Sequence, residues 1–174
     1  MTKDEQLKRT RKLKVGIGDS VTKAERGAPL DGAPKPHKMI AASGGLQVAA
    51  DIYGTEGPLV ILQHGGGQTR HAWKGAGQKL AEAGYLAVSL DARGHGDSDW
   101  APDGDYSNDA LVEDLVAVVD SFEQSPILVG ASMGGGTSLT AVGEGRVNAA
   151  ALVLVDTAPR IEAGGVRKIR DFMG

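Results

Sequence analysis

One serine of the sequence stands in the pattern of a catalytic nucleophile. Gly130, Ser132 and Gly134 form a Gly-x-Ser-x-Gly motif, which follows the apolar run 127–129 and precedes a run of small residues. The chain there must leave a strand, turn sharply and enter a helix, and glycines remove the Cβ atoms that would collide. Such a turn places the serine hydroxyl at the start of a helix, where the backbone N–H of Met133 can face a developing oxyanion. A glycine-rich turn that holds an idle serine would give the same motif, so other stretches must decide between the two.

The elements that would position Ser132 follow from hydrophobic patterning. After a β-hairpin with a Gly-containing turn, short apolar runs alternate with helix-like segments. The expected strands are 38–42, 46–53, 59–63, 85–90, 127–129 and 147–155, and the expected helices are 71–83 with Gly84 as C-cap, a Ser107-capped helix, and 133–142. This order predicts an α/β fold with a mostly parallel sheet and helices on both faces.

Four of the expected strands end in polar or glycine-rich residues. In sheets of this kind, sites lie outside the carboxyl ends of the parallel strands. We therefore expect the strand ends that carry His64, Asp91, Ser132 and Asp156 to converge on one rim.

The helix that follows Ser107 shows a clear amphipathic pattern. Its apolar side chains recur at helical spacing and form one stripe: Leu111, Leu115, Val118, Val119 and Phe122. The pattern places Glu113, Asp114 and Asp120 off this stripe.

Composition limits the class of protein. The chain has 174 residues, 41% hydrophobic and 24% charged, which is typical of one globular domain. Its net charge of −3 favours neither nucleic acid nor an anionic membrane. The absence of cysteine excludes disulfides, thiol catalysis and Cys-ligated metal, and it fits a reducing compartment. Without an apolar run long enough to span a bilayer or a secretory h-region, we expect a cytoplasmic protein with no membrane partner.

The N-terminal segment 1–36 differs from the rest of the chain. Basic residues crowd its start, and glycines and prolines follow with few large apolar side chains. We expect it to be a disordered tail that does not pack. A basic arm for nucleic acid is an alternative interpretation, but a solvated tail, or an upstream extension from a misplaced start codon, is the one we favour.

Three motifs together resemble the α/β-hydrolase fold over residues 38–174. They are His64-Gly65-Gly66-Gly67 with Trp73 soon after, Asp91-Ala92-Arg93-Gly94-His95-Gly96-Asp97-Ser98, and Gly130-Ala131-Ser132-Met133-Gly134-Gly135. The chain is most similar in these motifs to bacterial serine esterases, C–C bond hydrolases and metal-free haloperoxidases. A serine at the elbow argues against epoxide-hydrolase and dehalogenase chemistry, because those relatives carry aspartate there.

The resemblance implies roles for particular residues. Ser132 would be the nucleophile, and the N–H groups of Met133 and Gly66 (with Gly67 as the next candidate) would form the oxyanion hole. His64, Gly130 and Gly134 would be structural residues near the site. The implied substrate is a small molecule with an ester or related acyl bond, and neither cofactor nor metal is expected.

The chain also departs from the family pattern. In the family, the acid and then the histidine follow the nucleophile, whereas all four histidines here precede Ser132. We therefore expect the general base to be missing from this chain. Asp156 is a possible acid, although a turn or N-cap aspartate would look the same, and Asp91 and Asp97 are interpreted as carboxylates that shape their loop.

The sequence is accordingly interpreted as a tail over 1–36 and the N-terminal part of an α/β-hydrolase domain over 37–174, truncated before the cap and the last strands. In that case the strand 147–155 becomes an apolar sheet edge, which favours self-association. The alternative to a hydrolase is a truncated or pseudo-hydrolase fragment without turnover, which acts at most as a binding module.

Overall fold

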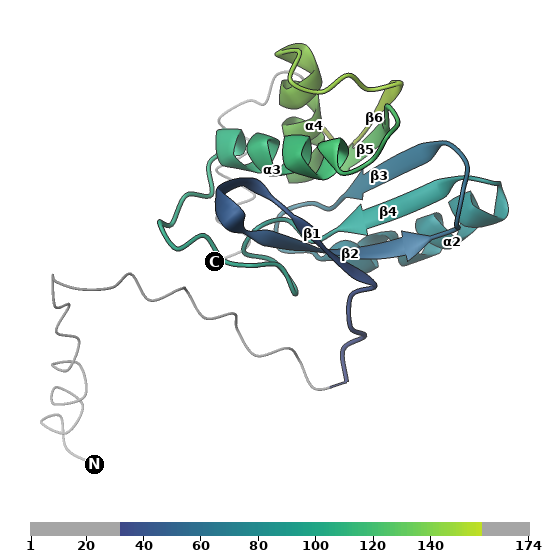
Figure 1. The fold of residues 1–174 in the computed structure, drawn as a ribbon, viewed down its shortest axis with the longest axis horizontal. Helices are drawn as coiled ribbons and strands as arrows, with labels where there is room; N and C mark the ends of the chain where they lie inside the picture. Colours follow the sequence, from purple (N-terminus) through teal and green to yellow (C-terminus); the bar gives the residue numbers. More distant parts are fainter. Residues whose placement is uncertain (1–31, 158–174) are drawn as a thin grey trace, which may run out of the picture.

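Six strands form one sheet in the computed structural model, which describes residues 32–157 (Figure 1). They are β1 (Lys38–Ala41), β2 (Gln47–Tyr53), β3 (Leu59–Gln63), β4 (Leu86–Leu90), β5 (Ile127–Ala131) and β6 (Ala151–Val155). Their order in the sheet is β1-β2-β4-β3-β5-β6. β2 pairs antiparallel with β1 and β4, and all the other neighbours are parallel. The predicted hairpin and the mostly parallel sheet are confirmed.

Helices cover both faces of this sheet, as predicted. The helical segments are η2 (Ser43–Gly45), η3 (Arg70–Trp73), α2 (Lys74–Glu82), α3 (Asn108–Asp120) and α4 (Met133–Gly143). α3 and α4 pack against each other on one face, and α2 packs against β2 and β4 on the other (Figure 1). The helix expected over 71–83 therefore consists of a short 3-10 turn followed by α2.

Local sequence signals set the helix ends. The Ser107 hydroxyl accepts a hydrogen bond from the Ala110 N–H (3.2 Å), so Ser107 is the N-cap of α3. Gly84 ends α2 in a left-handed conformation with φ 86°, and its N–H donates to the Ala81 carbonyl (3.0 Å). Both predicted caps are confirmed.

The buried face of α3 differs from the predicted stripe. Its buried residues are Ala110, Val112, Asp114, Leu115 and Val118, whereas Leu111 is half-buried. The prediction was wrong for Asp114. Its carboxylate is buried because the charge of Arg93 compensates it. Apolar periodicity alone cannot detect such a pairing.

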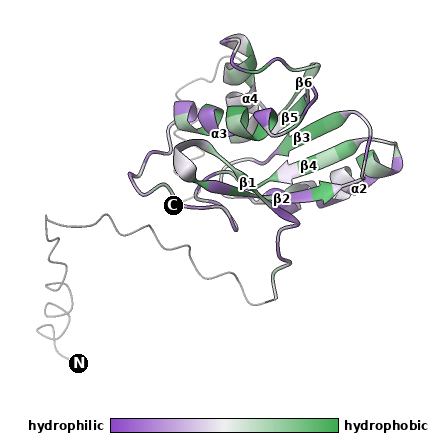
Figure 2. Cartoon of the chain, in the orientation of Figure 1, coloured by the Kyte–Doolittle hydropathy of each residue, from purple (hydrophilic) through white to green (hydrophobic). Residues whose placement is uncertain are grey.

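The central strand β3 is buried on both faces. Leu59, Val60, Ile61 and Leu62 are each at most 2% exposed. Ile61 belongs to the large core under α3 and α4, whereas Val60 and Leu62 belong to the smaller core on the α2 side. The continuous apolar character of β3 is visible in Figure 2. This strand ends directly in His64, so a rigid element carries the first motif to the rim.

The last described strand is shorter than predicted. β6 begins at Ala151 and not at residue 147. The reason is the end of α4, where Gly145 has φ 69° and the N–H groups of Arg146 and Val147 both donate to the Ala141 carbonyl (2.9 and 3.1 Å). Val147 is buried as part of this helix cap, so it is unable to join the sheet.

β6 lies at one edge of the sheet and pairs only with β5 within residues 32–157. Val153 and Val155 are 45% and 42% exposed, so the strand presents apolar side chains together with open backbone groups. We propose that this edge pairs with a second copy of the chain.

The proposal predicts that the 174-residue chain self-associates as its concentration rises, which sedimentation velocity would detect. Val153→Lys should weaken the association, because a lysine on an edge strand opposes strand pairing. Gln78→Lys adds the same charge at an exposed position of α2 and should leave the self-association unchanged. A chain that stays monomeric over the whole concentration range would contradict the proposal.

Parts of the sequence interpretation lie outside the described residues. The tail expected over 1–36 is described only from residue 32, where the Pro34 carbonyl accepts a hydrogen bond from Arg70 Nη2 (2.8 Å). The helix-like pattern that begins at Arg160 also lies outside them. No helix within the described part combines the length and the apolar character needed to cross a bilayer.

Candidate active site

Ser132 occupies the sharp turn between β5 and α4. Its backbone angles are φ 45° and ψ −107°, a conformation that residues other than glycine rarely adopt. Its N–H donates to the Val155 carbonyl of β6 (3.1 Å), and its carbonyl accepts from the Gly136 N–H (2.9 Å). The sharp turn expected at this residue is therefore present, and it strains the backbone. Ser132 is exposed at the carboxyl end of β5.

The glycines around Ser132 allow α4 to approach the sheet. A methyl group on Gly130 would lie 2.4 Å from the backbone of Gly134. One on Gly134 would lie 2.5 Å from the Gln63 Cβ, and one on Gly135 would lie 2.4 Å from the Thr157 hydroxyl. These distances are too short for real contacts, so the motif needs glycine for steric reasons.

The loop 64–70, which follows β3, lies against this turn. The Gly134 N–H at the start of α4 donates to the His64 carbonyl (3.2 Å). A Cβ built on Gly65 would lie 3.5 Å from the Ser132 Cβ. The fold therefore brings the first and third motifs together, as the topology predicted.

Of the backbone N–H groups of the three loop glycines, hydrogen bonding leaves one free. The Gly65 N–H donates to the Gln68 side chain (3.0 Å), and the Gly67 N–H donates to His95 Nε2 (3.4 Å). The Gly66 N–H has no partner among residues 32–157, and Gly66 is exposed. The Met133 N–H, in the first turn of α4, has no partner there either. The Met133 N–H, next to Ser132 in the chain, and the Gly66 N–H, in the loop beside it, are thus free among residues 32–157, whereas the Gly67 N–H is already engaged.

His64 is buried, and both of its ring nitrogens are used. Its Nδ1–H donates to the Gly65 carbonyl (2.8 Å), while Nε2 accepts from the Ala92 N–H (3.0 Å). These partners define the neutral imidazole. Burial lowers the pKa of His64, and the nearby His95 ring, 5.0 Å away between centroids, lowers it further. The arrangement suits a structural residue that joins two loops.

The lowered pKa of His64 predicts a stability loss in mild acid. Below the ordinary value of 6.5, the unfolded chain binds a proton at His64 that the folded chain resists. The free energy of unfolding should therefore decrease as the pH falls below about 6.5, as measured by urea denaturation at a series of pH values. His64→Gln should flatten this part of the profile, whereas the exposed His37→Gln should not. An unchanged slope in His64→Gln would contradict the assignment.

The other three histidines also have partners away from Ser132. His95 Nδ1–H donates to the Arg93 carbonyl (3.1 Å), and its Nε2 accepts from Gly67. His37 Nδ1 accepts from the Ile52 N–H (2.9 Å), and His71 Nδ1 lies 3.5 Å from Asp51 Oδ2. No histidine hydrogen-bonds Ser132 in the described part of the chain.

Sequence reasoning missed the residue that organises the acidic groups of the rim. Arg70 is fully buried, and its guanidinium contacts Asp51, Asp91 and Asp97. Asp91 does shape its own loop, since Oδ2 accepts from the Asp97 N–H (3.0 Å), but its carboxylate also pairs with Arg70. An arginine that follows a glycine-rich loop gives no periodic signal, so nothing in the sequence pointed to this cluster.

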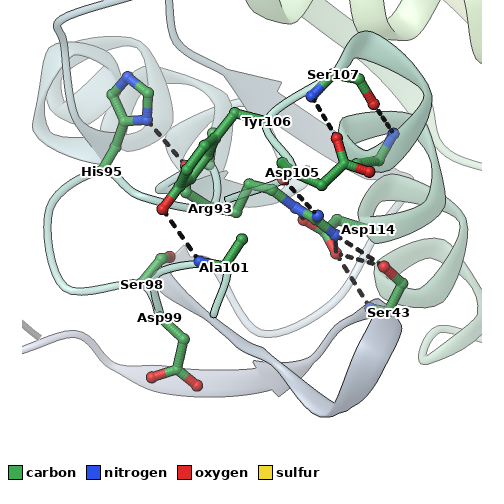
Figure 3. Close-up of polar contacts among 12 residues, drawn as sticks. Ser43, Arg93, His95, Ser98, Asp99, Ala101, Asp105, Tyr106, Ser107 and Asp114 are labelled. Atoms are coloured by element: carbon green, nitrogen blue, oxygen red, sulfur yellow. Dashed lines mark hydrogen bonds and ion pairs between the residues drawn. The ribbon is translucent and has the colours of Figure 1, made fainter. Parts of the chain in front are cut away.

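A second buried pair lies nearby and was also missed. Arg93 Nε and Nη2 contact the two carboxylate oxygens of Asp114 (2.6 and 2.7 Å), and Nη2 also donates to the Ser43 hydroxyl (2.8 Å). Figure 3 shows this fork reaching from the loop after β4 to α3 and to the hairpin turn. Asp114 outweighs the effect of burial, and the pKa of Arg93 is raised. The pair joins α3 to the loop after β4.

Asp156 and Trp73 lie in different surroundings. Asp156 directly follows β6, is exposed and has φ 51°. Trp73, from the first motif, is half-buried and packs against the smaller core. No group of three His, Cys, Asp or Glu side chains that could hold a metal ion occurs between residues 32 and 157.

A small cavity of about 30 Å³ lies beneath the rim. It is lined by residues of β4, α3 and α4 and by His64, and Ser132 is not among them. The volume suits about one or two water molecules and is far too small for an acyl substrate. This cavity is therefore not a substrate pocket.

Comparison with known proteins identifies the family. Residues 58–170 match the family model for the alpha/beta hydrolase fold, so the chain belongs to that family. An esterase of Mycobacterium tuberculosis is 35% identical over 113 residues, which cover 64% of this chain and 37% of the relative. The solved structure of a thermophilic esterase from Thermogutta terrifontis has a TM-score of 0.66 at 28% identity, covering 76% of this chain and 50% of the other.

An epoxide hydrolase from Vigna radiata is also similar in structure, with a TM-score of 0.66 at 25% identity over 79% of this chain and 46% of the other. The chain thus spans half or less of the length of these relatives.

Proposed function

We propose that this chain carries the nucleophile and the oxyanion hole of a serine hydrolase that cleaves ester or related acyl bonds. The observation that carries the proposal is the strained, exposed Ser132, which lies next to the free Met133 N–H and beside the loop that carries the free Gly66 N–H. Esterases are among the proteins that the chain resembles.

In the proposed mechanism, Ser132 Oγ attacks the carbonyl carbon of the substrate. The carbonyl oxygen becomes an oxyanion and accepts hydrogen bonds from the Met133 and Gly66 N–H groups. The general base takes the hydroxyl proton during the attack. Collapse of the tetrahedral intermediate returns that proton to the departing alcohol and leaves an acyl-serine, which water then hydrolyses. No cofactor enters these steps.

Attack by Ser132 needs a general base, because a serine hydroxyl is a weak nucleophile at neutral pH. Each histidine of the chain already has a partner elsewhere. We therefore assign no histidine of this sequence as the base. Asp156 stays a candidate acid, since it follows the strand that hydrogen-bonds Ser132.

Hydrolysis of p-nitrophenyl butyrate and of styrene oxide would test the proposed class of reaction. The account predicts release of p-nitrophenol and no opening of the epoxide, because a serine ester forms only from an acyl donor. Opening of the epoxide without ester hydrolysis would overturn it.

The engaged histidines favour one second candidate, a binding module without turnover. A binding module would bind p-nitrophenyl butyrate but release p-nitrophenol no faster than the Ser132→Ala variant does. Isothermal titration calorimetry with a non-hydrolysable ketone analogue would detect the binding.

A further inference from the structure

The loop that carries the free Gly66 N–H is fastened to the loop after β4 at three points. His64 Nε2 accepts from the Ala92 N–H at the start of the loop, and the Gly67 N–H reaches His95 in the middle. Arg70 closes the loop at its far end. Gly66 itself lies in a turn that the Gln68 N–H closes on the Gly65 carbonyl (3.1 Å). The His95 contact is long at 3.4 Å, so Arg70 is the stronger of the two links that tie this side of the turn to the loop after β4.

The Arg70 side chain contacts three carboxylates and one backbone carbonyl. Its Nη1 lies 2.5 Å from Asp91 Oδ2 and 2.8 Å from Asp97 Oδ2, and its Nε lies 3.0 Å from Asp51 Oδ1. Its backbone N–H also donates to Asp91 Oδ1 (2.6 Å). Side chain and backbone of the same residue are thus held by one carboxylate, which fixes where the loop 64–70 ends.

The buried carboxylates of this cluster require the charged, planar side chain of an arginine at position 70. Burial acts to lower the pKa of Arg70, but Asp51 and Asp91 outweigh it and the pKa is raised, so the guanidinium stays charged. Asp91 is fully buried and would be uncompensated without that charge. Only the planar guanidinium offers five donors in a fixed fork, whereas a lysine is a single point charge.

We propose that Arg70 is a positioning residue of the oxyanion hole: its contacts with Asp51, Asp91 and Asp97 hold the loop so that the Gly66 N–H faces the Ser132 site. This inference rests on the proposed function for its catalytic consequence. Its structural part, the restraint of Gly66, stands on the geometry alone.

The catalytic consequence is tested with Arg70→Lys on p-nitrophenyl butyrate. A donor that is displaced by about 1 Å stabilises the transition state less while substrate binding is spared, so kcat should fall roughly 100-fold with KM within about twofold. Arg93→Lys is the matched control, because it weakens a second buried arginine–carboxylate pair, whose side chains bond α3 and the hairpin turn. It should lower the melting temperature and leave kcat per folded molecule unchanged.

The restraint of Gly66 is tested without turnover by ¹⁵N relaxation of the backbone amides. Arg70→Lys should increase the motion of the Gly66 and Gly67 amides, and Arg93→Lys should not. The proposal would be overturned if the Gly66 and Gly67 amides in Arg70→Lys are as rigid as in the wild type, or if their motion increases equally in both variants. Should Arg70→Lys fail to fold, Asp97→Asn removes one carboxylate at a partly exposed position and should give a smaller change in the same direction.

The two hypotheses fail in different ways. If Ser132→Ala leaves ester hydrolysis unchanged, the proposed function is wrong, and the relaxation data still decide whether Arg70 holds the loop. If Ser132→Ala abolishes hydrolysis but Arg70→Lys behaves like Arg93→Lys, only the positioning role is wrong.

Discussion

Replacement of Ser132 by alanine is expected to abolish the hydrolysis of p-nitrophenyl butyrate that proceeds through an acyl-serine. The variant keeps the oxyanion donors and the fold, but it has no oxygen at the tip of the turn that could form the acyl intermediate. Initial rates at equal concentrations of folded protein measure the effect.

Ser125→Ala is the matched control for this prediction. Ser125 is an exposed serine just before the opposite end of the same strand, β5, so its removal should leave the rate unchanged. Equal loss in both variants would mean that the hydrolysis does not depend on the elbow, and an unchanged rate in Ser132→Ala would exclude Ser132 as the nucleophile.

Gly130→Ala is expected to have the largest effect on stability. The added methyl group would meet the backbone of Gly134 and Gly135 at 2.4–2.5 Å, and neither backbone can move without displacing α4 from the sheet. We expect a loss of about 3 kcal/mol in the free energy of unfolding, measured by urea denaturation.

Gly136→Ala tests the same substitution at a site without a steric conflict. Gly136 lies within α4, and a methyl group there would have no neighbour within 4 Å. It should be neutral or stabilise the chain by about 0.5–1 kcal/mol, because alanine favours helix more than glycine does. Similar losses in the two variants would mean that close packing does not explain the glycines of the motif.

The order of the elements and their convergence on one rim could be predicted from the sequence. Ser107, Gly84 and the apolar run of β3 act through local rules of capping and burial, so their structural roles follow from the residues themselves. The tight turn at Ser132 is equally local, because the two glycines beside it have no Cβ to block the close approach of the helix to the strand.

The charged interior could not be predicted in the same way. Arg70 and Asp51 lie in different elements, as do Arg93 and Asp114, and each pair forms only because the fold brings distant segments together. Apolar periodicity treats a buried aspartate as a surface residue, which is why Asp114 was misplaced. The start of β6 was misplaced for a related reason, since Val147 is used by the cap of α4.

The choice between Gly66 and Gly67 as an oxyanion donor also depended on tertiary structure. Both glycines are equally small, and the sequence favoured Gly66 only by resemblance. In the structure, His95 occupies the Gly67 N–H, and the Gly66 N–H stays free among residues 32–157. The contact between Gly67 and His95 thus favours Gly66 as the oxyanion donor, which the motif alone did not decide.

The most direct test of Ser132 as a nucleophile is the intact mass of the protein from its source cells, before and after incubation with a fluorophosphonate. Attack by the serine oxygen expels fluoride and leaves the phosphonyl group on the protein. The account predicts one added phosphonyl group per chain, which peptide mapping places on Ser132 and which is absent in Ser132→Ala. An unmodified mass in a protein that hydrolyses p-nitrophenyl butyrate, or a label on any other residue, would contradict the assignment of Ser132 as the nucleophile.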